Sequence, residues 1–271
     1  MTSKNRKFKI YSVSSFLLFV IFIGFVALSW QIPATETEST SSLNTDTAQA
    51  SLQMQAPDSA ISFGVYVNEI YETARLANAG LALPVFEKAM TGFVNLKNAR
   101  VLSNAKDVLT VVDFTRSSKE KRMWIIDLKS KSLLLNTFVA HGQGSGDDMA
   151  NKFSNVAESH QSSLGFYLTN ETYFGKHGLS LRLDGMDKDI NSKARNRAIV
   201  VHGADYVSQD FINTHGRLGR SFGCPAVPVE LNKTVINLIK DKTCLFINGK
   251  SSNYNSEWLN QQLATETFSK I

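Results

Sequence analysis

One stretch of this chain, residues 199 to 228, constrains its fold more than any other. It begins with an apolar triplet, Ile199 to Val201, that ends on the pair His202-Gly203. The run Ser221-Phe222-Gly223-Cys224 follows, and its cysteine is twenty-two residues after the histidine. A strand that ends in a glycine-rich loop can hold a histidine and a cysteine in a fixed relation.

The residue types in this stretch indicate acyl-transfer chemistry. A thiol is a nucleophile only as the thiolate, and a nearby imidazole can take its proton. The glycines at 216, 219 and 223 allow tight turns and can leave N–H groups free to face an oxyanion. On residue types alone, the stretch is a candidate Cys–His acyl-transfer site.

Two other interpretations use the same residues. Cys224 and Cys244 could form a structural disulfide in an exported chain, and without the surrounding motif this would be the favoured reading. A metal site would use His202, His215 and Cys224, but their spacings of 13 and 9 match no compact zinc pattern. We therefore predict no metal and no cofactor.

The stretch resembles the catalytic motif of the YkuD-like L,D-transpeptidases of bacterial cell walls, in which a strand ends in His-Gly and a glycine-rich loop leads to Ser-His-Gly-Cys. Phe222 stands where most of the family has a second histidine, and Pro225-Ala226 stands where the common form has an apolar residue and an arginine. The stretch is most similar to a branch of this family in which the motif is Gly-Arg-Ser-aromatic-Gly-Cys-Pro. The resemblance runs from about Val108 to Asn248 and includes V-A-H-G-Q-G-S-G at 139–146, Q-S-S-L-G-F-Y at 161–167 and Y-F-G-K-H-G at 173–178.

The resemblance implies roles for individual residues. Cys224 attacks a carbonyl as thiolate, and His202 removes the thiol proton and later protonates the leaving amine. The Gly203 carbonyl orients the imidazole, and the N–H groups of Gly223 and Cys224 are the oxyanion donors. The residues expected to bind substrate are Arg220, Ser221, His141, Tyr167 and His215.

Two of these residues are expected to compensate for the departures from the common motif. Arg220 would hold a substrate carboxylate in place of the arginine missing after Cys224. His215 would either replace the histidine missing at 222 or simply be exposed. Three further arginines, at 182, 195 and 197, are expected to be solvated or to pair with a substrate carboxylate.

The resemblance also implies a substrate. Family members cut a peptidoglycan tetrapeptide stem after the L-centre of its diamino acid and release D-alanine. The acyl group then passes to an amine on another stem, to a lipoprotein lysine or to water. Two alternatives stay open: an L,D-carboxypeptidase or endopeptidase of the same fold, and an inactive peptidoglycan-binding module.

The patterns predict a mainly β (α+β) catalytic domain with an N-terminal helical pair. Helical spacing in 61–98 predicts two helices, with a stop at Gly80 and a start at Pro84. Strands are expected at 108–114, 123–127, 133–139, 165–169 and 243–247, with a helix from Pro228 and a short helix in the tail. Tyr173, Lys176 and His177 fall between glycines and are expected in a loop.

The N-terminus reads as an export signal. Lys4, Arg6, Lys7 and Lys9 precede a thirteen-residue apolar run from Phe16 to Leu28, which suits a signal-peptide core, although an uncleaved anchor is the alternative. Either form places the body outside the cytoplasm, in the periplasm or cell envelope. The predicted division is 1–30 signal peptide or anchor, 31–60 disordered linker, 61–100 helical pair, 101–250 catalytic domain and 251–271 tail.

The charge of the chain excludes one class of partner. The formal net charge is +5, from 29 basic and 24 acidic residues. Four of the basic residues belong to the N-terminal signal, and the remaining 25 nearly balance the 24 acidic ones. No basic patch dominates the body, so nucleic-acid binding is not predicted. The sequence does not set the oligomeric state.

Overall fold

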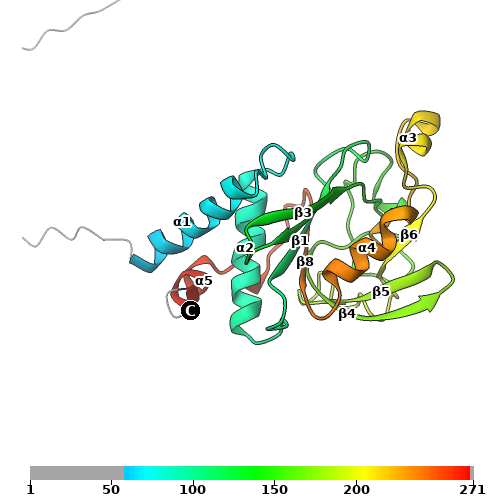
Figure 1. The fold of residues 1–271 in the computed structure, drawn as a ribbon. Coiled ribbons are helices and arrows are strands. Elements are labelled where there is room, and N and C mark those ends of the chain that lie inside the picture. Colours follow the sequence, from blue (N-terminus) through cyan, green and yellow to red (C-terminus); the bar gives the residue numbers. More distant parts are fainter. Residues whose placement is uncertain (1–57, 269–271) are drawn as a thin grey trace, which may run out of the picture. The chain divides into compact units, whose positions relative to one another are not determined.

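The computed structural model describes residues 58–268, and Figure 1 shows how their helices and strands are arranged. The elements are α1 (Asp58–Thr73), α2 (Leu83–Asn98), β1 (Val108–Asp113), β2 (Met123–Asp127), β3 (Ser132–Thr137), η1 (Gln143–Ser145), β4 (Gly165–Gly175), β5 (Gly178–Gly185), β6 (Val200–Ala204), α3 (Gln209–His215), β7 (Ala226–Pro228), α4 (Val229–Ile239), β8 (Cys244–Asn248), η2 (Glu257–Leu259) and α5 (Gln261–Phe268). Within 58–268 no helix is long and apolar enough to cross a membrane.

The eight strands form one sheet in the order β3-β2-β1-β8-β4-β5-β6-β7. Most neighbours are antiparallel, but β1 pairs with β8 and β6 pairs with β7 in parallel. Ala140, in the segment after β3, forms an antiparallel bridge with Ala226 at the start of β7. This bridge joins the two ends of the sheet, so the strands form a nearly closed barrel and the β-rich fold predicted from the sequence is confirmed.

The central strands are buried on both faces. In β1, Leu109 and Val111 belong to the hydrophobic cluster that includes residues of α1 and α2. Val108 and Val112 belong to a second cluster, which includes Val235 of α4. Because side chains alternate along a strand, this arrangement makes every residue of β1 apolar or buried. The same double burial explains the continuous apolar run in β8.

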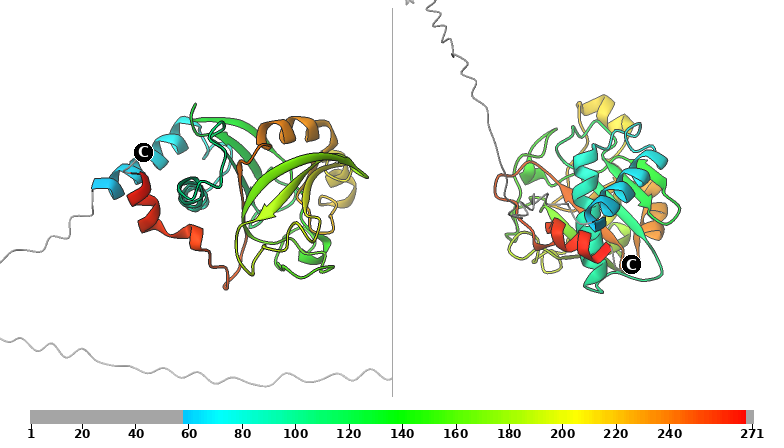
Figure 2. Two further views of the ribbon diagram at one scale, coloured as in Figure 1. Left: turned by 90° about the horizontal axis from the view of Figure 1, so that it is seen from below. Right: turned by 90° about the vertical axis from the view of Figure 1, so that its left-hand side faces the viewer.

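Three helices cover one face of the sheet. Figure 2 shows α1, α2 and α5 gathered on that face, which confirms the predicted N-terminal helical pair. The Trp124 indole on β2 donates to the Ala79 carbonyl at 2.9 Å, and this bond ties the connection between α1 and α2 to the sheet. A side chain on Gly92 of α2 would meet the Phe166 ring of β4, because a Cβ there would lie 2.0 Å from the ring. Helix and sheet can therefore approach this closely only with glycine at position 92.

Several elements differ from the sequence prediction. The strand predicted at 165–169 extends to Gly175, so Tyr173 lies in β4 and only residues 176 and 177 form the turn to β5. The helix α3 falls in a stretch that we expected to be a loop, where Ser208 accepts from the Phe211 N–H as its N-cap. The signal segment and residues 31–57 of the predicted linker lie outside the described residues, and 58–60 belong to α1.

The contact between α2 and β4 yields a stability prediction. The substitution Gly92→Ala forces a methyl group into the Phe166 ring and should lower the free energy of unfolding by about 1–3 kcal/mol. Gly64→Ala on α1 is the matched control, since a Cβ there has no atom within 4 Å. The control should raise stability by about 0.5–1 kcal/mol through helix propensity. Urea denaturation followed by circular dichroism measures both, and an equal effect of the two changes would contradict the close approach.

Candidate active site

The histidine of the motif lies in the middle of β6. His202 pairs with Ser180 of β5 on one side and with Ala226 of β7 on the other. Its side chain is only 3% exposed. The Nδ1 atom lies 2.9 Å from the Gly203 carbonyl oxygen. A carbonyl oxygen can only accept a hydrogen bond, so Nδ1 carries the proton of the neutral ring and Nε2 is left free to accept one.

The cysteine lies beside the start of the same strand. Cys224 precedes by two residues Ala226, the strand partner of His202. The Cys224 Sγ accepts a hydrogen bond from the Val200 N–H at 3.4 Å, two residues before the histidine on β6. The thiol is free and half-buried. The structure therefore places the predicted nucleophile, just before β7, against the strand β6 that carries the predicted base.

Burial keeps both groups uncharged. Burial raises the pKa of the Cys224 thiol. The Val200 N–H and the charge of Arg197 both lower this pKa, but their effect is smaller than that of burial. Burial also lowers the pKa of His202, and His177 lowers it further. The hydrogen bond to the Gly203 carbonyl raises this pKa, but by less than burial lowers it. At neutral pH the pair is thus a thiol and a neutral imidazole. Such a pair needs the imidazole to act as general base during attack, rather than a thiolate that is already formed.

A turn closed by Ser221 presents the thiol. The Ser221 hydroxyl accepts from the Gly223 N–H at 3.0 Å and donates to the Cys224 carbonyl at 2.6 Å. Gly223 has φ +120°, and a Cβ there would lie 2.8 Å from the Gln161 carbonyl oxygen, so the turn needs glycine. Because the Gly223 N–H is already bonded inside the turn, it is not the free oxyanion donor that we predicted. The bonds of the turn do not use the Cys224 N–H, which remains as a donor.

His141 is buried, and its backbone is hydrogen-bonded to this turn. Its side chain is buried, and its Nδ1 lies 2.8 Å from the Nη2 of Arg122, itself fully buried. Burial and the Arg122 charge lower the pKa of His141 to about 4, so the ring is neutral and Nδ1 accepts. The His141 carbonyl accepts from the Ser221 N–H at 3.0 Å. The substrate role predicted for this side chain is replaced by a role in holding the motif.

Two arginines differ from their predicted roles. Arg220 donates to Asp147 at 2.6 Å and to the Gly146 carbonyl at 2.9 Å, so its guanidinium is already paired with a carboxylate of the chain. Arg197, expected to be solvated or to meet substrate, donates to the Gln161 carbonyl at 2.6 Å and to the Ser163 hydroxyl at 2.7 Å. The positive charge of Arg197 nevertheless acts on the site, because it lowers the pKa of the Cys224 thiol.

The remaining two predicted binding residues make their contacts with other parts of the chain. Tyr167 is completely buried in the core, and its hydroxyl donates to the Ser163 carbonyl at 3.0 Å. We therefore assign Tyr167 a structural role. His215 is exposed at the end of α3, where its ring stacks on Phe211 with centroids 4.0 Å apart. Nothing in the described structure links His215 to His202.

The sequence analysis placed His177 in a loop, but it gave neither His177 nor His160 a place beside the motif. His177, in the turn between β4 and β5, stacks on His202 with ring centroids 4.4 Å apart and planes at 26°. His160 stacks on Phe222 at 4.4 Å, and Phe222 is 67% exposed beside the nucleophile. His177 belongs to the block 173–178 that carried the resemblance. That block was the one signal in the sequence that pointed to it.

The structure contradicts the disulfide alternative. Both cysteines carry free thiols, and Cys244 is fully buried in β8. Strands β4, β5 and β6 separate β8 from β7 in the sheet. The two cysteines are therefore too far apart for a disulfide, which needs Cα atoms closer than about 7 Å. Within the described part of the chain, His, Cys, Asp and Glu side chains form no group of three or more that could hold a metal ion.

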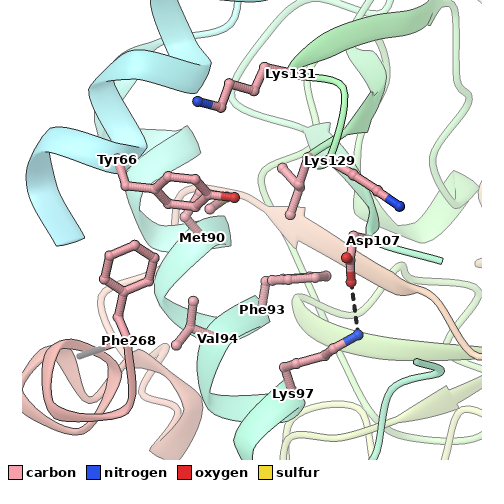
Figure 3. Close-up of a pocket in the computed structure, with 10 residues that line it drawn as sticks. Tyr66, Met90, Phe93, Val94, Lys97, Asp107, Lys129, Lys131 and Phe268 are labelled. Atoms are coloured by element: carbon pink, nitrogen blue, oxygen red, sulfur yellow. Dashed lines mark hydrogen bonds and ion pairs between the residues drawn. The ribbon is translucent and has the colours of Figure 1, made fainter. Parts of the chain in front are cut away.

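A separate cavity lies on the helical side of the sheet. It has a volume of about 380 Å³ and is lined by residues of α1, α2, α5 and the turn between β2 and β3. Figure 3 shows Tyr66, Met90 and Phe93 around it, with Lys97 paired to Asp107 at 2.8 Å on one edge. It shares no residue with the motif, so it is not part of the candidate active site.

Comparison with solved structures gives low similarity throughout. An L,D-transpeptidase from Mycobacterium smegmatis is 10% identical, with a TM-score of 0.34, 53% of this chain covered and 59% of the other. Pgp2, a helical cell shape determining protein from Campylobacter jejuni (K307A mutant), is 13% identical, with a TM-score of 0.35 and coverages of 68% and 62%. An L,D-transpeptidase from Stackebrandtia nassauensis is 12% identical, with a TM-score of 0.33 and coverages of 64% and 68%.

The match to a family model is more extensive. The chain spans between 50% and 59% of the length of the first three solved structures. No curated protein matches. The model of the L,D-transpeptidase catalytic domain matches residues 77–248, which include β1 to β8, His202 and Cys224. Because this match covers more than half of the chain, the protein belongs to the L,D-transpeptidase catalytic domain family.

Proposed function

We propose that this protein is a cysteine L,D-transpeptidase that acts on the tetrapeptide stems of peptidoglycan. One observation carries the proposal: a neutral imidazole, held at Nδ1 by the Gly203 carbonyl, lies on the strand next to a free and half-buried thiol. Membership of the family supports the substrate class. The neutral state of both groups supports acyl transfer through general-base activation of Cys224.

Acylation begins when the stem peptide lies over the turn at Ser221. The His202 Nε2 takes the thiol proton while Cys224 Sγ attacks the carbonyl carbon on the L-centre of the diamino acid. The carbonyl oxygen becomes an oxyanion, and the Cys224 N–H, which the resemblance assigns as an oxyanion donor, would stabilise it. The C–N bond to D-alanine then breaks. The imidazolium returns its proton to the leaving amine, and the acyl group stays on sulfur as a thioester.

Transfer reverses these proton movements. An acceptor amine attacks the thioester carbonyl, His202 removes a proton from that amine, and the C–S bond breaks. The sulfur recovers the proton as a thiol, and a new amide joins the two stems in a 3→3 cross-link. Water in place of the amine would release a tripeptide, which is the hydrolytic outcome. The export signal predicted in residues 1–30 supports action in the periplasm or cell envelope.

The first test is turnover of a defined muropeptide. The purified chain is incubated with disaccharide-tetrapeptide, and the products and the intact protein mass are followed by mass spectrometry. We expect release of D-alanine, a cross-linked dimer and an acyl adduct on the protein. Cys224→Ala should abolish all three, because no other described thiol reaches the site.

Cys244→Ala is the matched control, since it removes the other thiol from the core of β8. This variant should keep turnover. Tripeptide without dimer would assign the hydrolase instead. Absence of turnover and of any adduct would leave the inactive peptidoglycan-binding module as the function.

The protonation state of the thiol gives a second prediction. Because burial raises the pKa of Cys224, its alkylation by iodoacetamide should still be accelerating above the ordinary thiol pKa of about 8.5. Arg197→Gln removes a charge that favours the thiolate, so the pKa should rise further and alkylation at pH 8 should slow. The rate is read from intact mass between pH 6 and 10. A midpoint below 7 would mean that a thiolate–imidazolium pair exists before substrate binds.

Arg195→Gln controls for the loss of an arginine. Arg195 is paired with Glu171 and Asp184 on the outside of the β4–β5 hairpin, so its charge is already matched by carboxylates. This variant should leave the alkylation profile unchanged. Thermal denaturation of both variants checks that the hydrogen bonds lost with Arg197 have not unfolded the segment around Gln161.

A further inference from the structure

The turn between β4 and β5 places a second imidazole on the catalytic base. Gly175 pairs with Gly178 across the hairpin, which leaves Lys176 and His177 at its tip. The His177 ring lies on the His202 ring at a centroid distance of 4.4 Å, with an angle of 26° between the planes. His177 is itself exposed, whereas His202 is buried. One face of the base is thus covered by a side chain that is open to solvent on its other side.

Contacts outside the site hold the hairpin in place. Arg182 of β5 lies over the Tyr173 ring of β4 at 4.5 Å and pairs with Glu171 at 3.1 Å. Arg195 also pairs with Glu171, at 2.8 Å, so the outer surface of the hairpin is linked to the segment before β6. No hydrogen bond is recorded for the His177 ring among the described residues, so its stacking on His202 is its defining contact.

Two contacts together can fix the imidazole of His202. The bond from Nδ1 to the Gly203 carbonyl holds one edge of the ring, but a single hydrogen bond leaves the plane free to tilt. A stacked ring holds the plane, because tilting would separate the two faces or make them collide. With the edge and the face both held, Nε2 has one direction left in which to point.

We propose that His177 is a positioning residue of the transpeptidase reaction, and that its stacked ring holds the His202 imidazole in the plane from which Nε2 takes the Cys224 proton. This inference rests on the proposed function. The contact that the structure gives His177 at the site is with the His202 ring. His177 acts through the base alone.

The charges around His202 support the same assignment. The hairpin contributes His177, β5 contributes Ser180 as strand partner, and the loop before β7 contributes the uncharged Cys224 thiol. From α4, Asn232 lies against Gly203. No carboxylate is among these groups, so the Gly203 carbonyl is the one of them that favours a positive charge on the ring. Burial and the neighbouring His177 both lower the pKa of His202, which keeps it a base in slightly acidic solution.

The test compares two substitutions that separate the ring from its charge. His177→Phe keeps an aromatic face on His202, and His177→Ala removes it. At pH 7.5, where His202 is neutral in both variants, we expect His177→Ala to lower kcat roughly 10- to 100-fold with KM little changed. His177→Phe should stay within about threefold of the unmodified chain. Lys176→Ala, at the adjacent position of the same turn, is the control and should be unchanged.

A second readout needs no turnover. The ring resonances of His202, assigned by comparison with His202→Gln, are followed by NMR against pH. His177→Ala uncovers His202 and removes a positive neighbour, so the pKa of His202 should rise toward its ordinary 6.5. His177→Phe keeps the cover and loses only the charge, so the rise should be smaller. The order of the three pKa values can be measured even if the chain proves not to be a transpeptidase, so failure of the proposed function is distinguishable from failure of this inference.

Two results would overturn the role of His177. If His177→Ala leaves both kcat and the pKa of His202 unchanged, the stacked ring does not act on the base. If His177→Phe loses as much kcat as His177→Ala, the aromatic face is not what positions the imidazole. Loss of folding in His177→Ala is checked by thermal denaturation, and the Phe variant then carries the comparison.

Discussion

The parallel pairing of β6 with β7 is the constraint on which the site depends. The register sets His202 opposite Ala226, and this places Cys224 beside the start of the strand that carries the base. The same Ala226 is bridged by Ala140 from the segment after β3. One residue therefore joins the two ends of the sheet and fixes the relation between nucleophile and base. A slip of one residue in this pairing would move the side chains to the other face and separate the two groups.

Buried polar groups hold the turn that carries the Cys224 thiol. The guanidinium of Arg122 is fully buried, yet its donors reach the carbonyls of Val139 and Arg116 and the ring of His141. A buried charge is tolerated only with such partners, so this cluster must be complete for the barrel to fold well. Burial lowers the pKa of Arg122 to about 9. The His141 carbonyl accepts a hydrogen bond from the Ser221 N–H, which attaches the turn to this buried cluster.

Sequence patterns predicted the strands and helices because burial leaves a local trace. The β-branched run of β1 and the helical stripe of α2 both reflect faces that the core demands. At the candidate site, the sequence pointed to some residues and gave no role to others. His202 and Cys224 stand in a motif, whereas the contacts of His177 with His202 and of Arg197 with the segment at Gln161 are tertiary and could not be read from a local pattern. Tyr167 was misplaced because a strand buried on both faces shows no alternation to reveal which residues face the site.

The order of strands also bears on how the chain can meet oxidants before it folds. In the unfolded chain Cys224 and Cys244 are 20 residues apart, a separation at which loop closure is entropically easy. In the folded sheet they are far apart, since β6, β5 and β4 lie between β7 and β8 on one side and β3, β2 and β1 lie between them on the other. A bond formed early between them would forbid the native strand order. Reaching the native sheet thus requires the two thiols not to bond to each other before the strands have paired, which makes the timing of oxidation a folding constraint.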